Sequence, residues 1–104
     1  DIWLQFEKSQ CSYNFTESSA DNLRKLFEIY QAEANNLIEK KLTYPALDFV
    51  LKCSHTFNLL DARGVISVTD RAQYIEKIRK LAREVASSWM EERNGLNFPL
   101  IKNL

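Results

Sequence analysis

The chain has 104 residues, of which 45% are hydrophobic and 27% charged, and its 14 basic residues balance its 14 acidic ones. This composition is typical of a single soluble globular domain, and the zero net charge argues against a protein devoted wholly to nucleic-acid binding. No apolar run approaches the roughly 18 residues of a membrane span, and no signal peptide opens the chain. Only two glycines and two prolines are present, which favours an all-α fold over a sheet-rich or loop-rich one.

Residues 1–17 contain apolar side chains without a sustained period, so we interpret them as an arm or one short helix. The first main helix is predicted over residues 19–41. Ser18 or Ser19 is suited to its N-cap. Apolar residues then recur at spacings of three and four, which is typical of one buried helix face: Leu23, Leu26, Phe27, Tyr30, Ala34, Leu37 and Ile38.

The second main helix is predicted over residues 45–62. Pro45 suits the first helical position, and Gly64 suits a left-handed residue just beyond the end. At helical spacing, one face is apolar and is expected in the core: Ala46, Val50, Cys53, Phe57 and Leu60. Leucines and a phenylalanine also lie off this face. A helix that is apolar nearly all round is either central or covered by a partner.

The third main helix is predicted over residues 70–94. Residues 65–68 are interpreted as an extended connection, Thr69 as the N-cap and Gly95 as the end of the helix. The apolar residues 98–100 are expected to fold back on the bundle. Residues 18–104 would then form one antiparallel three-helix bundle. Because the chain begins with Asp1 instead of Met, we expect either a domain excised from a larger subunit or a processed chain.

Two opposite charges fall on core faces close to the turn at Gly64. The helical wheel places Asp61 on the core side of the second helix and Arg71 on the core side of the third. A buried charge needs a partner, so we predict that these two residues form an ion pair. If the pair is buried, replacing Asp61 by alanine should cost a few kcal/mol. The alternative is that both side chains reach water at the helix ends.

Two further groups of residues are candidates for function. His55 lies beside Leu51 and Leu59, and because no nucleophile is placed near it, we interpret this set as a surface or an interface. Residues 51–104 carry nine basic and six acidic residues, and three of the cations lie close together on the third helix: Arg79, Lys80 and Arg83. Such a group can hold a phosphate. The alternatives are a solvated helix face or arginines whose stems cover the core edge.

Motifs for catalysis are absent from the sequence. It contains no glycine-rich phosphate loop, zinc signature, carboxylate pair or Ser-His-Asp arrangement. Cys11 and Cys53 have no CxxC spacing, so they predict neither a disulfide framework nor a zinc site, and they fit a reducing, intracellular compartment. We therefore expect no catalytic residue, cofactor site or metal site within these residues.

The run from Ser54 to Arg71 closely resembles a stretch near the C-terminus of the alpha subunit of bacterial heterotetrameric glycyl-tRNA synthetase. The family pattern is Ser-His-x-Phe-Asn-Leu-Leu-Asp-Ala-Arg-Gly-x-Ile-Ser-Val-Thr-Glu-Arg, and the chain departs from it only in having Asp70 for the glutamate. The flanks are also similar to the family: Ser12 to Phe15, Tyr74-Ile75, Ile78 to Arg83, and Phe98-Pro99. The resemblance therefore covers nearly the whole chain.

This resemblance implies a helical domain of a glycine–tRNA ligase, a class II aminoacyl-tRNA synthetase of alpha2beta2 composition that uses ATP and magnesium. The class II motifs are not in this chain, so the fragment alone is expected to be inactive. The implied partners are the beta subunit or region, the catalytic domain of the alpha subunit and glycine-specific tRNA. The implied location is the bacterial cytoplasm, or an organelle if alpha and beta are fused. Asp61, Arg63, Gly64 and Arg71 would form a structural turn within the family motif.

Two functions remain open at this point. In the first, the domain docks the alpha subunit to beta through Leu51, His55 and Leu59, and helps to place tRNA through contacts of Arg79, Lys80 and Arg83 with its phosphates. In the second, the chain is a helical protein–protein interaction module that never binds RNA.

Overall fold

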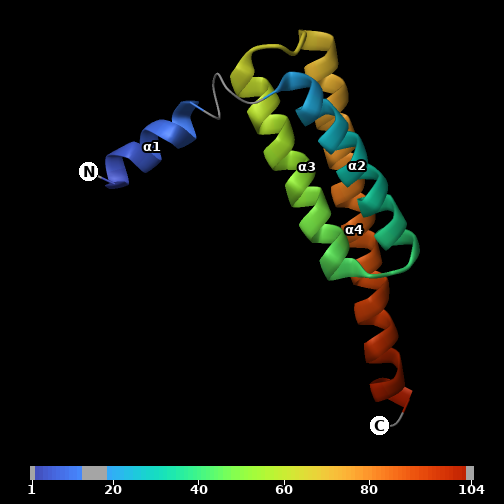
Figure 1. Ribbon diagram of the computed structural model, residues 1–104. Coiled ribbons are helices and arrows are strands. Elements are labelled where there is room, and N and C mark those ends of the chain that lie inside the picture. The colour runs from blue at the N-terminus through green and yellow to red at the C-terminus, as the bar shows by residue number, and fades with distance from the viewer. Residues whose placement is uncertain (1, 13–18, 103–104) are drawn as a thin grey trace.

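The computed structural model describes residues 2–12 and 19–102, which form four α-helices and no strand. The helices are α1 (Ile2–Ser12), α2 (Ala20–Glu39), α3 (Thr43–Arg63) and α4 (Val68–Lys102). Helices α2, α3 and α4 pack as an antiparallel bundle, and α1 stands apart from it (Figure 1). The predicted all-α bundle, with a short helix in its N-terminal arm, is confirmed. Of the helices described, none is both long and apolar enough to cross a membrane.

Helix α2 begins where a serine can cap it and ends where the backbone turns left-handed. The backbone N–H of Asn22 donates to Ser19 Oγ at 3.3 Å, so Ser19 is the N-cap; Ser18 lies outside the described residues. The helix ends at Glu39, two residues before the predicted end, because Lys41 has a φ of 59°. The N–H groups of Lys41 and Leu42 donate to the carbonyls of Ile38 and Leu37, at 3.0 and 2.9 Å. This pattern is a Schellman motif, in which the left-handed position usually holds glycine.

Replacing Lys41 by glycine is expected to raise the free energy of unfolding by about 0.5–1 kcal/mol, because glycine has no Cβ to strain a left-handed turn. The lost ion pair between Lys41 Nζ and Glu91 Oε2, 3.4 Å apart, is exposed on both sides and contributes little. The matched control is Lys40→Gly, since Lys40 has an ordinary φ of −83° and gains nothing from glycine. Urea unfolding of both variants measures the difference. A Lys41 variant no more stable than the Lys40 control would contradict the assignment of strain.

Helix α3 starts two residues earlier than predicted. Pro45 is the third residue of the helix rather than the first, a place where the N–H would still lack a partner within the helix. The early start buries Thr43, whose Oγ1 lies 3.1 Å from Ser88 Oγ of α4. The predicted end is confirmed within one residue, because Gly64 adopts a φ of 69° just after Arg63.

Both predicted ends of the third helix are wrong. Its cap is Ser67 rather than Thr69, since Ser67 Oγ accepts from the N–H of Asp70 at 3.1 Å. At the other end, α4 continues through Gly95 to Lys102, because one glycine costs a helix only about 1 kcal/mol relative to alanine. Residues 98–100 belong to this extension, which projects beyond the other two bundle helices instead of folding back (Figure 1).

The core lies where the three bundle helices meet. Every residue of the predicted core face of α3 is buried: Ala46, Val50, Cys53, Phe57 and Leu60. Burial raises the pKa of the Cys53 thiol to about 11, so the side chain is an uncharged, small hydrophobe at neutral pH. Tyr74 of α4 contacts the rings of Phe27 and Phe57 at centroid distances of 4.7 and 5.9 Å. This aromatic contact joins all three helices.

The ion pair predicted across Gly64 is present but is not buried. Arg71 Nε lies 3.3 Å from Asp61 Oδ1, and the two side chains are 53% and 41% exposed. Both residues sit at helix ends, where the end of the bundle is open to water, so the alternative in which both reach solvent is correct. An exposed pair is worth about 1 kcal/mol or less, and the few kcal/mol expected for a buried pair no longer apply.

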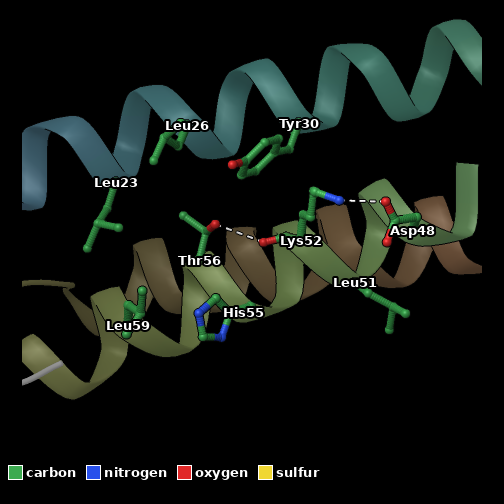
Figure 2. A pocket seen from close by; sticks show the side chains of 9 residues that line it. All are labelled: Leu23, Leu26, Tyr30, Asp48, Leu51, Lys52, His55, Thr56 and Leu59. Atoms are coloured by element: carbon green, nitrogen blue, oxygen red, sulfur yellow. Dashed lines mark hydrogen bonds and ion pairs between the residues drawn. The ribbon is translucent and has the colours of Figure 1, made fainter. Parts of the chain in front are cut away.

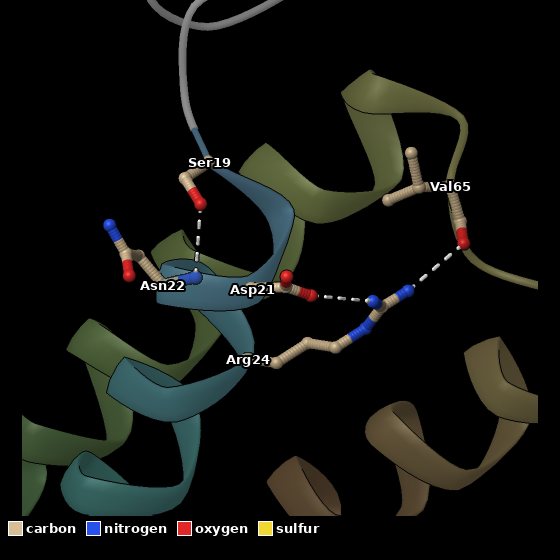
Figure 3. A network of polar contacts seen from close by, with 5 residues as sticks. All are labelled: Ser19, Asp21, Asn22, Arg24 and Val65. Carbon is tan, nitrogen blue, oxygen red and sulfur yellow. Dashed lines mark hydrogen bonds and ion pairs between the residues drawn. The ribbon is translucent and has the colours of Figure 1, made fainter.

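A second polar link closes the same end of the bundle. Arg24 of α2 donates from Nη2 to the backbone carbonyl of Val65 at 3.2 Å, and its Nη1 lies 3.7 Å from Asp21 Oδ1 (Figure 3). The carbonyl belongs to the connection between α3 and α4. Arg24 therefore ties the start of α2 to a turn 41 residues away in sequence, a contact that helical spacing does not reveal.

Candidate interaction site

A hollow lies between α2 and α3 and brings the three predicted interface residues together (Figure 2). It is lined by side chains of both helices, which include Leu23, Leu26, Tyr30, Leu51, His55 and Leu59. Leu51, His55 and Leu59 follow one another at intervals of four, so they share one side of α3. Leu59 is buried, whereas His55 is exposed and Leu51 is 59% exposed. The interface role of these residues stays a prediction.

Three polar side chains of this hollow, those of Asp48, Lys52 and Thr56, have partners within α3. Lys52 Nζ makes an ion pair with Asp48 Oδ2 one turn earlier, and Thr56 Oγ1 donates to the Lys52 carbonyl at 2.8 Å (Figure 2). Around His55, the described residues provide neither a nucleophile nor a carboxylate within hydrogen-bond distance. The arrangement suits the binding of apolar side chains from a partner, with the imidazole as a polar group at the edge.

Two residues of the hollow come from a helix face that the sequence assigned entirely to the core. Leu26 and Tyr30 belong to the apolar stripe of α2, yet Leu26 is exposed and Tyr30 only half-buried. The stripe is wider than the strip of α3 that covers it, so its edge remains open. Leu26 and Tyr30 follow the same apolar period as the buried residues of α2. The period therefore does not distinguish the residues at the edge of the stripe from those in the core.

The three predicted phosphate contacts are all exposed on α4, but they differ in their pairing. Arg83 Nη2 donates to Glu76 Oε1 at 2.9 Å. For Arg79 and Lys80, the described part of the chain offers no ion pair. Arg79 shares a shallow hollow with Arg71. An anion would therefore meet Arg79 and Lys80 first, while Arg83 would have to leave Glu76.

The residues of the predicted structural turn lie together at one end of the bundle. Asp61 accepts from Arg71, Gly64 makes the left-handed turn, and the side chain of Arg63 is half-buried beside it. Their arrangement is that of a turn held by local contacts. Among the described side chains, no group of three or more His, Cys, Asp or Glu residues is placed to hold a metal ion.

A family model described as "Glycyl-tRNA synthetase alpha subunit" matches residues 1–94. The chain belongs to this family. The match confirms the resemblance seen in the sequence, and it includes the hollow between α2 and α3 as well as the cations of α4. Members of the glycyl-tRNA synthetase alpha subunit family are subunits of an aminoacyl-tRNA synthetase, which is a ligase.

Proposed function

We propose that the chain is a helical docking region of a glycyl-tRNA synthetase alpha subunit, and that it binds the beta subunit or region through the hollow between α2 and α3. The observation that carries the proposal is the exposure of Leu51 beside an apolar floor, on the central helix of the bundle. Catalysis, with ATP and magnesium, is assigned to the catalytic domain of the parent subunit, in the cytoplasm or an organelle. The region itself takes no part in the chemistry.

The composition of the hollow favours a protein partner. Covering Leu26 and Leu51 would remove apolar surface from water, which is worth about 25 cal/mol for each Å² buried. Asp48 and Lys52 already neutralise each other at the edge, so the partner need not supply an isolated charge to either of them. His55 is exposed between them and Leu59, where it can exchange a hydrogen bond with water for one with the partner.

Replacing Leu51 by glutamate is expected to weaken binding to the beta subunit by about 30-fold or more, because the substitution puts a charge into an apolar contact. Stability should change by no more than about 0.5 kcal/mol, since Leu51 is largely in water in the free chain. The matched control is Ile29→Glu on α2, which is 60% exposed and outside the hollow. Calorimetric titration with the beta subunit compares the two. Equal weakening by both variants, or by neither, would contradict docking at this hollow.

A second role rests on the two cations of α4 for which no ion pair is found among the described residues. Arg79 and Lys80 are adjacent and exposed, and we propose that they contact phosphates of the glycine-specific tRNA. Each phosphate contact releases counterions, so the logarithm of the binding constant falls by about 0.9 for each contact per log unit of salt.

Replacing both Arg79 and Lys80 by glutamine is expected to make the salt dependence of tRNA binding shallower by roughly two contacts, because two phosphates are no longer neutralised. The control replaces Lys40 and Lys41 by glutamine, which removes the same charge at the end of the bundle where α2 meets α3. Fluorescence anisotropy at several salt concentrations gives both slopes. A binding constant of the unmodified chain that does not change with salt would reject the RNA role and leave the module that binds protein only.

A further inference from the structure

A second groove lies between α3 and α4 and shares no residue with the hollow between α2 and α3. Its lining is almost wholly apolar and includes Leu47, Ala82, Ala86 and Trp89. Leu47 is 42% exposed and Trp89 is 38% exposed, and both alanines are exposed as well. Apolar side chains that gather on a surface in this way are typical of a contact site.

The α4 side of the groove belongs to one stripe along the helix. Ala82, Ala86 and Trp89 follow one another at intervals of four and three, so they lie on one side of α4. The same alternation reaches Arg79, three residues before Ala82, and Arg93, four residues after Trp89. Intervals that alternate between three and four are the spacing by which two helices pack along each other. The apolar part of the stripe therefore lies between two arginines.

The alanines give the groove the shape of a seat for a helix. Ala82 and Ala86 are one turn apart in its lining, and the larger side chains of Leu47 and Trp89 stand beside them. Small residues between larger ones allow another helix to approach to the distance of about 8–10 Å between axes that is typical of helix packing. From one arginine to the other, the stripe is roughly 21 Å long at 1.5 Å per residue. A helix of about four turns has this length.

The two arginines of the stripe give the groove positive charge at both ends. Arg79 and Arg93 are exposed, and the described part of the chain offers neither of them an ion pair. The guanidinium carbon of Arg93 lies 5.3 Å from the centre of the Trp89 ring, at the end of the groove. Glu92 borders the same end, but it lies about 100° around α4 from Arg93 and so off the stripe. A partner with negative charge at both ends of an apolar stretch would match this surface.

We propose that the groove between α3 and α4 binds an amphipathic helix of a protein partner. The apolar side chains of this helix would cover Leu47, Ala86 and Trp89, and two of its carboxylates, about four turns apart, would meet Arg79 and Arg93. A strand of RNA fits less well, because it carries a phosphate at every nucleotide and no cation is found among the residues that line the groove. Arg79 is also one of the two proposed tRNA contacts, so a carboxylate and a phosphate would compete for it, whereas Arg93 has no part in that role.

A pair of synthetic helical peptides tests the charge pattern on the folded chain. The first peptide has leucines at intervals of three and four between two glutamates, which are placed at the spacing of Arg79 and Arg93. The second has lysines instead of the glutamates. Fluorescence anisotropy of the labelled peptides should show that the first binds at least about tenfold more tightly, because the lysines replace two attractive contacts by two repulsive ones. The double variant Arg79→Glu with Arg93→Glu should reverse this preference.

Variants of the groove test the apolar contact. Leu47→Glu is expected to raise the Kd of both peptides by about tenfold or more, because it puts a charge into the centre of the contact. Ile29→Glu on α2 is the matched control and should leave both Kd values unchanged. If circular dichroism shows that Leu47→Glu does not fold, Ala86→Gln repeats the test, since it fills the exposed floor of the groove without touching the core.

Amide chemical shifts of the chain locate the bound peptide, and the expected changes run from Ala82 to Trp89. The proposal is overturned if neither peptide binds the folded chain, if both bind equally well, or if the shifts change elsewhere. A single-stranded RNA that changes the same shifts and displaces the first peptide would assign the groove to RNA, and this result would also overturn the proposal.

Discussion

Replacing Phe27 by alanine is expected to lower the free energy of unfolding by about 3–5 kcal/mol, the usual cost of truncating a fully buried phenylalanine. Phe27 is 1% exposed, and its ring meets Tyr74 edge to face at 4.7 Å. The substitution removes transfer free energy and also leaves a cavity where α2 meets α4. Because domains of this size are stable by only about 5–15 kcal/mol, the loss should lower the Tm by on the order of 15 °C or more.

Chemical denaturation measures the effect of Phe27→Ala, and Ile29→Ala serves as the control on the same helix. Ile29 is largely exposed, so its loss should stay within about 0.5 kcal/mol. Two variants with similar midpoints would show that α2 does not pack with Phe27 toward the core. A changed denaturant slope in Phe27→Ala alone would indicate instead that the three helices no longer unfold together.

Replacing Leu60 by alanine is expected to cost about 2–5 kcal/mol of stability, because Leu60 is fully buried near Leu23 and Leu59. Leu51 lies nine residues earlier on the same helix but is 59% exposed. Leu51→Ala should therefore change stability by at most about 0.5 kcal/mol while it weakens binding of the beta subunit.

The two variants are expected to have opposite effects. Leu60→Ala should lower stability, whereas Leu51→Ala should weaken only the binding of the beta subunit. Thermal unfolding and titration with the beta subunit, carried out on both variants, supply the four measurements. Loss of stability in Leu51→Ala would mean that this side of α3 belongs to the core. A side of α3 that is buried in the core cannot bind a partner, so this result would contradict the proposed docking site.

The helical period predicted the interior of this bundle well, because burial of a side chain in a helix depends mainly on which face it occupies. The face of α3 from Ala46 to Leu60 illustrates this. Period alone does not say how wide the buried strip is. The helical period placed Asp61 in the core, but the bundle is open to water where α3 ends. The period also could not distinguish Leu59, which is buried, from Leu51, which is exposed.

Helix ends were harder to predict because several neighbouring residues compete for each cap. Ser67 and Thr69 are both good N-caps, and the structure uses Ser67. Lys41 occupies a left-handed position that a sequence would normally mark with glycine. Gly95 had the signal of a helix end, but it lies inside α4.

Of the two helices that line the candidate site, the sequence analysis selected residues on α3 only. Leu51, His55 and Leu59 were singled out because they lie off the main apolar face of α3. Leu26 and Tyr30 were not, since their spacing on α2 is that of ordinary core residues. Only the packing of α2 against α3 shows that the two edges meet around a hollow. The contact of Arg24 with the Val65 carbonyl was missed for the same reason.

The most direct test of the docking role is the mass in solution of the folded chain mixed with the beta subunit of its synthetase. The proposal predicts a stoichiometric complex that Leu51→Glu disrupts and Ile29→Glu preserves. If the chain is folded by circular dichroism and yet no complex forms at any concentration, the hollow between α2 and α3 is not a docking site for the beta subunit.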